Sequence, residues 1–479
     1  MANDERPRPA SAGVTRRSSI SRGVSRRGFL RAAAATALTA STWRRAYGAN
    51  ERIGIGMIGF GLIGRIHTRN FKALKDAEIV AVAETYRPRL EAAAALVGGR
   101  VASYGDFRKL LEHKNIDAVV VSTPDHWHAL MTMLACAAGK DVYVEKPLTL
   151  FVREGRWMVQ VARRYGRVVQ VGTQQRSGPH YQQARQLMRD GRLGRLVSVE
   201  CNYFRNVMPG FGKPPDQDPP PELDWNMWLG PAPDRRYNPN RGIYHFRWFW
   251  DYSGGQMTNI GQHSLDTVHW FTGANGPTAV TSSGGRFFLE DNCEVPDTQD
   301  ALIEYPGFTA VCQFRECAAG MGRAAMGGVM FYGTKGTMPV AREGYELSPD
   351  RKDDPINIVA AMLGGHPVGG PQPMPGGGKE EYWTEPAKDT SGTWQQQYVA
   401  HTRNFLDSIK SRQQPNSDLE SGHRVATVCH LANISLHTGR KIRWDAEKEE
   451  IVGDPEAAKL LTRPYRKPWD AELRSLGVT

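Results

Sequence analysis

The segment that most constrains the fold lies at residues 52–84, where a short apolar run leads directly into a glycine-rich turn. Residues 52–58 have the composition of a buried strand, and the turn reads Gly59-Phe60-Gly61-Leu62-Ile63-Gly64 before an amphipathic stretch that ends at residue 74. A second strand pattern, at residues 78–83, ends on Glu84, which follows Gly64 by twenty residues. This order predicts a strand–turn–helix–strand unit of a parallel sheet.

The glycines and the carboxylate of this unit are the groups that a dinucleotide requires. Gly59 allows the tight turn, Gly61 lets backbone amides approach a pyrophosphate at the helix N-terminus, and Gly64 permits close packing of helix on strand. Glu84 can accept hydrogen bonds from the adenosine ribose, and its charge repels a 2′-phosphate. The sequence therefore predicts NAD as the cofactor, while Arg87, which could accommodate the extra phosphate, leaves NADP open.

The rest of the chain shows two successive patterns. Up to Arg176, strand patterns alternate with helix patterns, which predicts a doubly wound parallel sheet. The strand patterns lie at 118–122, 141–144 and 168–171, and the helix patterns at 126–138 and 152–165. Beyond Arg176 we expect a helix near 181–189, a strand at 196–203, an insertion rich in Pro and aromatic residues at 206–250, a helix at 257–271, antiparallel strands at 278–286, 298–305, 308–315 and 328–340, a Gly- and Pro-rich loop at 364–378, and helices at 398–410 and 420–438.

The first 48 residues are expected to be an export signal and are excluded from the fold. Ser25-Arg26-Arg27-Gly28-Phe29-Leu30-Arg31 precedes a mildly apolar stretch and small residues at 46–48, and this closely resembles a bacterial twin-arginine signal. The resemblance implies export by the Tat machinery to the periplasm or another extracytoplasmic site. These residues hold ten Arg and two acids, which leaves 51 basic and 48 acidic residues elsewhere. The overall charge of +11 is therefore no indication of a nucleic-acid partner.

Metal and disulfide chemistry find little support in the sequence. The six cysteines are scattered without CxxC spacing, so we expect mostly small buried residues rather than a zinc module or a disulfide framework. Asp125, His126 and His128 are three ligand-type residues within four positions, but no further ligands are evident. We predict no metal site.

Several spaced motifs resemble the Gfo/Idh/MocA family of NAD(P)-dependent oxidoreductases, whose hallmark is the tripeptide found here as Glu145-Lys146-Pro147. The likeness extends through Ser122-Thr123-Pro124-Asp125-His126-Trp127-His128, Gly172-Thr173-Gln174-Gln175-Arg176 and Gly333-Thr334-Lys335-Gly336-Thr337. It covers nearly everything beyond residue 52.

The resemblance implies a domain organisation and a class of partners. We expect an α/β protein with a Rossmann domain at 52–176, a C-terminal α/β domain with an open, mostly antiparallel sheet at 177–445, and a tail at 446–479. In the family the second sheet commonly serves subunit association and roofs a sugar or cyclitol pocket. A small carbohydrate or cyclitol substrate and a homodimer or homotetramer are therefore expected.

Oxidation of a carbinol requires a group that takes the hydroxyl proton and a donor that stabilises the oxygen. Lys146 follows a strand at the ligand-binding edge of the sheet, and partial burial would lower its pKa. His263 is the natural base and matches the family's Asp-x-Gly-x-His element, written here Asn259-Ile260-Gly261-Gln262-His263. Asn259 departs from that element, since an amide exchanges no proton at neutral pH. Asp266 either orients the His263 imidazole from the same helix face or is an ordinary packing residue.

Further site residues follow from the motifs. The residues expected to hold the cofactor are Gly59, Phe60, Gly61, Leu62, Ile63, Gly64, Glu84, Thr123, Pro124, Trp127, His128, Glu145, Lys146 and Gln175. The residues expected to touch substrate are Arg176 and, in the aromatic insertion, Tyr244, His245 and Arg247. That insertion could stack on a pyranose, pack internally or form a subunit contact.

Three functions are compatible with these features. The leading prediction is an exported sugar or cyclitol oxidoreductase whose cofactor is tightly bound, because no soluble NAD pool is expected outside the cytoplasm. A redox-neutral, NAD-dependent glycoside hydrolase or lyase acting through a transient keto-sugar is the first alternative. The second is a non-catalytic sugar-binding module, which Asn259 favours and the retained Lys146 and His263 oppose.

Overall fold

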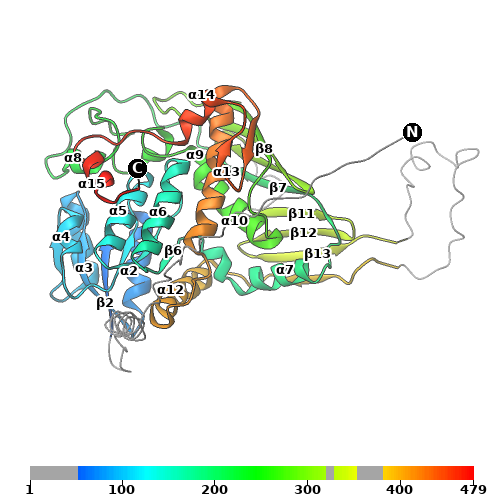
Figure 1. The fold of residues 1–479 in the computed structure, drawn as a ribbon, viewed down its shortest axis with the longest axis horizontal. Helices are drawn as coiled ribbons and strands as arrows, with labels where there is room; N and C mark the ends of the chain where they lie inside the picture. The colour runs from blue at the N-terminus through cyan, green and yellow to red at the C-terminus, as the bar shows by residue number, and fades with distance from the viewer. Residues whose placement is uncertain (1–51, 320–327, 353–380, 479) are drawn as a thin grey trace, which may run out of the picture. The chain divides into compact units, whose positions relative to one another are not determined.

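Parallel strands build the N-terminal domain. The computed structural model describes residues 52–319, 328–352 and 381–478. Six strands of this domain, drawn in blue to cyan in Figure 1, pair in the order β3-β2-β1-β4-β5-β6, and every neighbouring pair is parallel. The strands are β1 (Ile53–Ile58), β2 (Ala77–Ala83), β3 (Ala102–Tyr104), β4 (Ala118–Val121), β5 (Asp141–Val144) and β6 (Val169–Val171). The predicted doubly wound sheet is confirmed. Its strand order reverses between β1 and β4, the point where such sheets bind ligands beyond the carboxyl ends of their strands.

The connecting helices were only partly predictable. They are α2 (Leu62–Lys72), α3 (Arg87–Val97), α4 (Phe107–Leu111), α5 (Asp125–Ala137) and α6 (Val152–Arg164). The sequence patterns indicate α2, α5 and α6 but give no element at α3, β3 or α4. The reason is clear for α3, in which four of the eleven residues are alanine and only Ala93 is buried, so it has no apolar stripe.

A second, ten-stranded sheet forms the C-terminal domain. Its order is β14-β13-β12-β11-β7-β10-β9-β8-β15-β16. Only β7 and β10 run parallel to each other among the described pairs, which confirms the mostly antiparallel sheet. The strands are β7 (Leu196–Phe204), β8 (Ala279–Gly285), β9 (Thr298–Tyr305), β10 (Phe308–Arg315), β11 (Val329–Gly333), β12 (Gly336–Ala341), β13 (Gly344–Pro349), β14 (Ala387–Asp389), β15 (Ile442–Asp445) and β16 (Glu450–Ile451).

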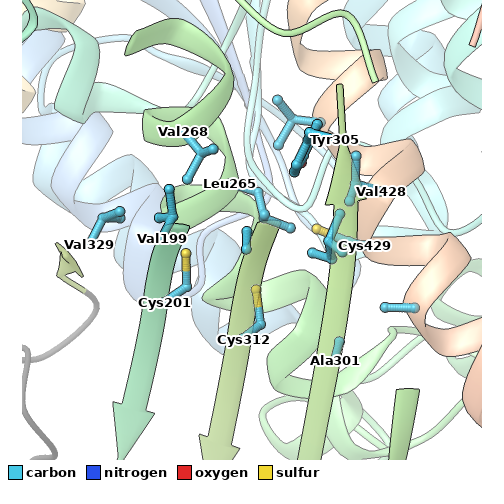
Figure 2. Packing of buried hydrophobic residues seen from close by; sticks show 14 of the residues in the cluster. Val199, Cys201, Leu265, Val268, Ala301, Tyr305, Cys312, Val329, Val428 and Cys429 are labelled. Atoms are coloured by element: carbon cyan, nitrogen blue, oxygen red, sulfur yellow. The ribbon is translucent and has the colours of Figure 1, made fainter. Parts of the chain in front are cut away.

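Two helices, α10 (Gly261–Thr272) and α13 (Leu419–Thr438), pack on one face of this sheet. Figure 2 shows Leu265 of α10 and Cys429 of α13 facing Cys201 and Cys312 of the paired strands β7 and β10. Five of the six cysteines are buried, Cys317 is half-buried and all are free, as expected from their spacing. The helix α7 (Pro179–Arg189) and the 3₁₀ turn η1 (Gln174–Ser177) lie next to α10. The helix α12 (Trp394–Ser411) packs on η1 and on α2 of the Rossmann domain, where Phe405 lies edge-on against Phe71 and Tyr143.

The single helix predicted at 257–271 is divided in the structure. α9 (Gly255–Asn259) ends at Asn259, and α10 begins after Ile260. The amide of His263 donates to the carbonyl of Ile260, while the Asn259 carbonyl accepts from the Lys146 ammonium instead. Asn259 and His263 therefore lie on separate helices and do not share one face, as a single helix over 257–271 would require.

The insertion and the C-terminal segment both pack against the N-terminal domain. Within 206–250 the structure has α8 (Trp225–Leu229) and the turn η2 (His245–Trp248), and Trp127 of α5 donates to the Trp228 carbonyl. The segment expected to be a tail contains α14 (Pro455–Ala458), the turn η3 (Lys459–Leu461) and α15 (Trp469–Ser475). Trp469 is only 2% exposed and packs edge-on against Trp127, with ring centroids 4.8 Å apart.

Two features of the sequence lie outside the described residues: the export signal at 1–48 and the Gly- and Pro-rich loop at 364–378. Within the part of the chain that the structure describes, every helix is too short or too polar to span a lipid bilayer.

Candidate active site

The glycine turn between β1 and α2 has the geometry that the sequence requires. Gly59 has φ of 89°, and a Cβ there would lie 2.7 Å from the Ser122 carbonyl oxygen. A Cβ on Gly64 would lie 2.4 Å from the Gly59 oxygen, so only glycine allows α2 to sit this close to β1. Gly61 faces open space, where the nearest atom to a Cβ would be a guanidinium nitrogen of Arg89 at 3.8 Å. The turn thus leaves room for an anion at the N-terminus of α2.

Glu84 is fixed at the end of β2 by the backbone. Its carboxylate accepts hydrogen bonds from the amides of Phe60 at 2.8 Å, Thr85 at 2.9 Å and Tyr86 at 3.1 Å. Arg87, which left NADP open in the sequence, points elsewhere and pairs with Glu222 at 3.3 Å. The arginine beside Glu84 in the pocket wall is Arg89.

A pocket with about 820 Å³ of empty space connects these groups. One wall comes from the Rossmann domain and the other from the insertion. The Rossmann wall includes Gly59, Gly61, Leu62, Ile63, Glu84, Arg89, Thr123, Pro124 and Trp127, and the insertion wall consists of Met227, Trp228, Ile243, Tyr244, Phe246 and Arg247. The glycine cradle and the fixed Glu84 carboxylate fit a dinucleotide.

Lys146 lies just beyond β5 and is held by one residue of the C-terminal domain. Its ammonium donates to the side-chain oxygen of Asn259 at 2.9 Å and to the Asn259 carbonyl at 3.1 Å. Burial lowers the pKa of Lys146 to about 8, with Glu145 acting in the opposite direction and Arg247 in the same one. The amine therefore titrates near neutral pH, in the direction expected from its position.

Two buried residues of the sequence motifs, Glu145 and His128, hold the backbone around Lys146 in place. Glu145 is buried and bonds to His67 at 2.7 Å. Burial alone would raise the pKa of Glu145, but the bond from His67 holds it below its usual value. The His128 ring bridges the carbonyls of Pro147 and Thr123. Glu145, Lys146 and His128 are not among the residues that line the dinucleotide pocket, contrary to the prediction, and Glu145 and His128 instead fix the loop that carries Lys146.

His263 is buried close to Lys146 and stays neutral. Burial, together with the charges of Lys146 and Arg342, lowers the pKa of His263 well below 6.5. Its Nδ1 has no hydrogen-bond partner among the residues described. A neutral imidazole can donate or accept a hydrogen bond at neutral pH, whereas Lys146 has the pKa suited to exchanging a proton.

Asn259 connects Lys146 to a buried carboxylate. The Asn259 amide nitrogen donates to Gln256 at 3.0 Å, and the Gln256 amide donates to Glu316. Glu316 also accepts from Arg205 and from the Trp248 indole. The side-chain amides of Asn259 and Gln256 thus lie between Lys146 and the Glu316 carboxylate. Asn259 therefore orients the ammonium without placing a negative charge beside it.

Replacing Asn259 by Asp is expected to raise the pKa of Lys146 from about 8 by roughly one to three pH units, because an adjacent carboxylate stabilises the ammonium. The pH dependence of Lys146 acetylation, followed by mass spectrometry, measures this pKa directly. Asn275→Asp, an exposed position, is the control. An unchanged labelling profile in Asn259→Asp would show that the contact does not control the amine.

Asp266 has a different partner from the one predicted. Both of its oxygens accept from the Arg176 guanidinium, at 2.7 and 2.8 Å, and both side chains are buried. The structure thus gives Asp266 no contact with His263 and turns Arg176 toward the interior instead of toward a substrate. Gln175 is buried next to Arg176, and its side-chain oxygen has no partner among the described residues.

The three side chains at 125–128 that could ligate a metal ion do not point toward a common site. Asp125 accepts from the Ser253 hydroxyl, His126 bonds to the Trp228 carbonyl, and His128 lies between two carbonyls. Within the described residues no group of three such side chains could hold a metal ion.

The structure divides the residues expected to touch substrate. Tyr244 and Arg247 line the dinucleotide pocket, facing the glycine turn. The His245 ring packs on Phe211, with centroids 4.1 Å apart, and is half-buried.

Sequence reasoning missed Arg342, which follows β12. It is 7% exposed, lies 3.9 Å over the Trp394 ring and depresses the pKa values of both Lys146 and His263. It makes no ion pair with any described carboxylate. Nothing local distinguishes it from other arginines at strand ends, since only the tertiary fold brings it to the site.

Comparison with known proteins identifies similar families and folds. A model of an oxidoreductase family with an NAD-binding Rossmann fold, GFO/IDH/MocA, matches residues 53–173. A model of the C-terminal alpha/beta domain of that oxidoreductase family matches residues 202–283 and 394–471. Together they cover more than half of the chain.

Among curated proteins, inositol 2-dehydrogenase 4 of Saccharopolyspora erythraea is 34% identical over 166 residues, which are 34% of this chain and 48% of that protein. The uncharacterized oxidoreductase YrbE of Bacillus subtilis is 24% identical over 294 residues, or 60% of this chain and 73% of that protein. The chain spans about half the length of the inositol dehydrogenases that it matches.

Solved structures share the fold. A levoglucosan dehydrogenase in complex with NADH and levoglucosan has a TM-score of 0.62 at 17% identity, and the WlbA dehydrogenase of Bordetella pertussis in complex with NADH and UDP-GlcNAcA has 0.60 at 19% identity. Each alignment covers 82% of this chain and 99% of the other.

Proposed function

Because the chain belongs to the Gfo/Idh/MocA family of oxidoreductases, with an NAD-binding Rossmann domain and a C-terminal α/β domain, we propose that it oxidises a CH–OH group of a sugar or cyclitol with NAD. Relatives described as inositol and levoglucosan dehydrogenases support this substrate class. The observation that carries the proposal is Lys146. It follows β5 at the ligand-binding edge of the sheet, is not itself part of the lining of the dinucleotide pocket, and has a pKa of about 8.

The proton steps follow from the three side chains. The unprotonated Lys146 amine accepts the hydroxyl proton of the substrate, while Asn259 fixes the position of its nitrogen. The neutral His263 imidazole donates a hydrogen bond to the substrate oxygen as it becomes a carbonyl. When bound, NAD supplies the nicotinamide ring that accepts the hydride.

We further propose that the protein is exported by the twin-arginine pathway and retains its cofactor outside the cytoplasm. The arginine pair at residues 26 and 27 supports export. We expect the protein to retain its NAD because no soluble NAD pool is expected outside the cytoplasm. The bound cofactor would then be reduced by one substrate and reoxidised by another. Exposed apolar residues of the second sheet, Val197 and Leu302, favour association through its open face into a homodimer or homotetramer.

Protein purified without added nucleotide and then denatured is expected to release stoichiometric NAD. Mass spectrometry identifies the nucleotide, and absorbance gives its amount. A panel of sugars and cyclitols added to the intact protein should then convert the bound NAD to NADH, seen as absorbance of the reduced nicotinamide. A protein that neither carries NAD nor takes it up would contradict the proposed function.

A further inference from the structure

The dinucleotide pocket is closed by a segment that belongs to the C-terminal domain. Ile243, Tyr244, Phe246 and Arg247 of the insertion lie across from the glycine turn and Glu84. A Rossmann domain alone leaves this side of the groove to solvent. Here the wall contains an exposed tyrosine, two apolar side chains and one guanidinium.

The insertion that carries this wall is attached to the Rossmann domain by backbone hydrogen bonds at residues 222 and 224. The Arg87 amide donates to the Glu222 carbonyl at 3.0 Å, and the Asp224 amide donates to the Thr85 carbonyl at 3.1 Å. Both contacts are next to Glu84 in the sequence. A segment joined in this way to the end of β2 is a fixed part of the pocket.

The turn at 242–244 has a conformation that directs side chains into the pocket. Ile243 has φ of 61°, which is a costly conformation for a β-branched residue. The Tyr244 amide donates to the Gly242 carbonyl at 2.7 Å, and a Cβ on Gly242 would lie 2.5 Å from the Tyr237 ring. Packing against Tyr237 therefore maintains the turn, and such strain is typical of ligand clamps.

Two guanidinium groups line the pocket, Arg89 beside Glu84 and Arg247 on the opposite wall, and neither forms an ion pair with a described carboxylate. Arg89 is half-buried and forms no side-chain hydrogen bond or ion pair with any described residue, and Arg247 bonds only to the Tyr244 carbonyl. Burial lowers the pKa of Arg89, the Glu84 carboxylate opposes this shift, and the positive charges of Arg65 and Arg247 add to it. Arg89 and Arg247 both line the pocket, one from each wall. Glu84 is the carboxylate that lines this pocket, and three amides already hold it.

We propose that Arg89 and Arg247 grip the pyrophosphate of the dinucleotide from opposite walls and that the fixed insertion keeps the cofactor bound between turnovers. The pyrophosphate carries two negative charges, which match two facing cations, and Arg89 lies beside Gly61, where that group meets the helix N-terminus. This inference rests on the proposed function for the identity of the ligand. It assigns to Arg247 a role in cofactor binding instead of substrate binding.

The test measures release of the cofactor from the holoprotein. Protein loaded with NAD is mixed with excess isotopically labelled NAD, and the exchange is followed by mass spectrometry after rapid desalting. Arg89→Gln and Arg247→Gln are each expected to accelerate exchange about 10- to 100-fold, the effect of losing one charge-assisted hydrogen bond. Arg236→Gln, an exposed position in the same insertion, is the matched control and should exchange like the wild type.

A second measurement separates loss of the phosphate contact from general loosening of the pocket. In protein stripped of NAD, Arg247→Gln should weaken binding of ADP-ribose about 10- to 100-fold and leave adenosine binding unchanged. Equal losses for both ligands, or wild-type exchange in both arginine variants, would overturn the inference. A wild-type protein that binds no NAD at all would instead refute the proposed function, so the two failures are distinguishable.

Discussion

Replacing Lys146 by Met is expected to lower kcat about 10²- to 10⁴-fold while the bound NAD is retained, because the variant keeps the length of the side chain and loses the group that exchanges the proton. The pKa of Lys146 is about 8, so the amine form that accepts a proton is populated above that pH. The wild-type rate should therefore fall as the pH drops below 8. The residual activity of Lys146→Met should show no such dependence.

The chain offers a matched control on the same strand. Lys140 precedes β5 at its opposite end, donates to the carbonyls of Ile116 and His113, and has a pKa lowered by burial. Lys140→Met should keep the wild-type kcat and pH profile. Retention of turnover in Lys146→Met, with NAD bound, would remove Lys146 from the catalytic mechanism.

Replacing Asp266 by Asn is expected to reduce the free energy of unfolding by about 3–5 kcal/mol, because it leaves the Arg176 guanidinium buried without its counter-charge. Both side chains are almost fully buried, so water cannot compensate for the lost partner. Denaturant unfolding followed by tryptophan fluorescence measures the change.

An exposed ion pair provides the comparison. Lys388 and Glu346 lie 2.7 Å apart on neighbouring strands, with both side chains more than half exposed. Glu346→Gln should change the free energy of unfolding by no more than about 1 kcal/mol. A similar small effect for Asp266→Asn would mean that Arg176 finds another partner or reaches solvent when the carboxylate is removed.

The parts of the fold that sequence predicts well are those determined by neighbouring residues. Gly59, Gly61 and Gly64 have the roles that their spacing indicates, since a tight turn and a close helix–strand contact depend on a few consecutive positions. The alternation of strands and helices likewise identifies the doubly wound sheet. Local signals of this kind remain valid whatever the rest of the chain does.

The sequence-based predictions are wrong where residues far apart in the sequence compete for the same backbone group or charged side chain. The break at Ile260 is not visible in the sequence, because Lys146 takes the Asn259 carbonyl from more than a hundred positions away. In the same way, Asp266 binds Arg176 from another element, and Arg342 reaches the site only through the hairpin of β12 and β13. Residue type and spacing do not predict such contacts between residues that are distant in the sequence.

The packing of Trp469 on Trp127 has a consequence for the order in which the protein matures. Trp127 lines the dinucleotide pocket, and its support comes from α15, which is translated long after the Rossmann segment. An ion pair from Arg108 to Glu472, 364 residues later, anchors this helix. A nascent chain that ends before residue 469 already contains the complete glycine turn but lacks this support. Capture of the cofactor should therefore follow translation of the C-terminal helix and not accompany emergence of the Rossmann segment.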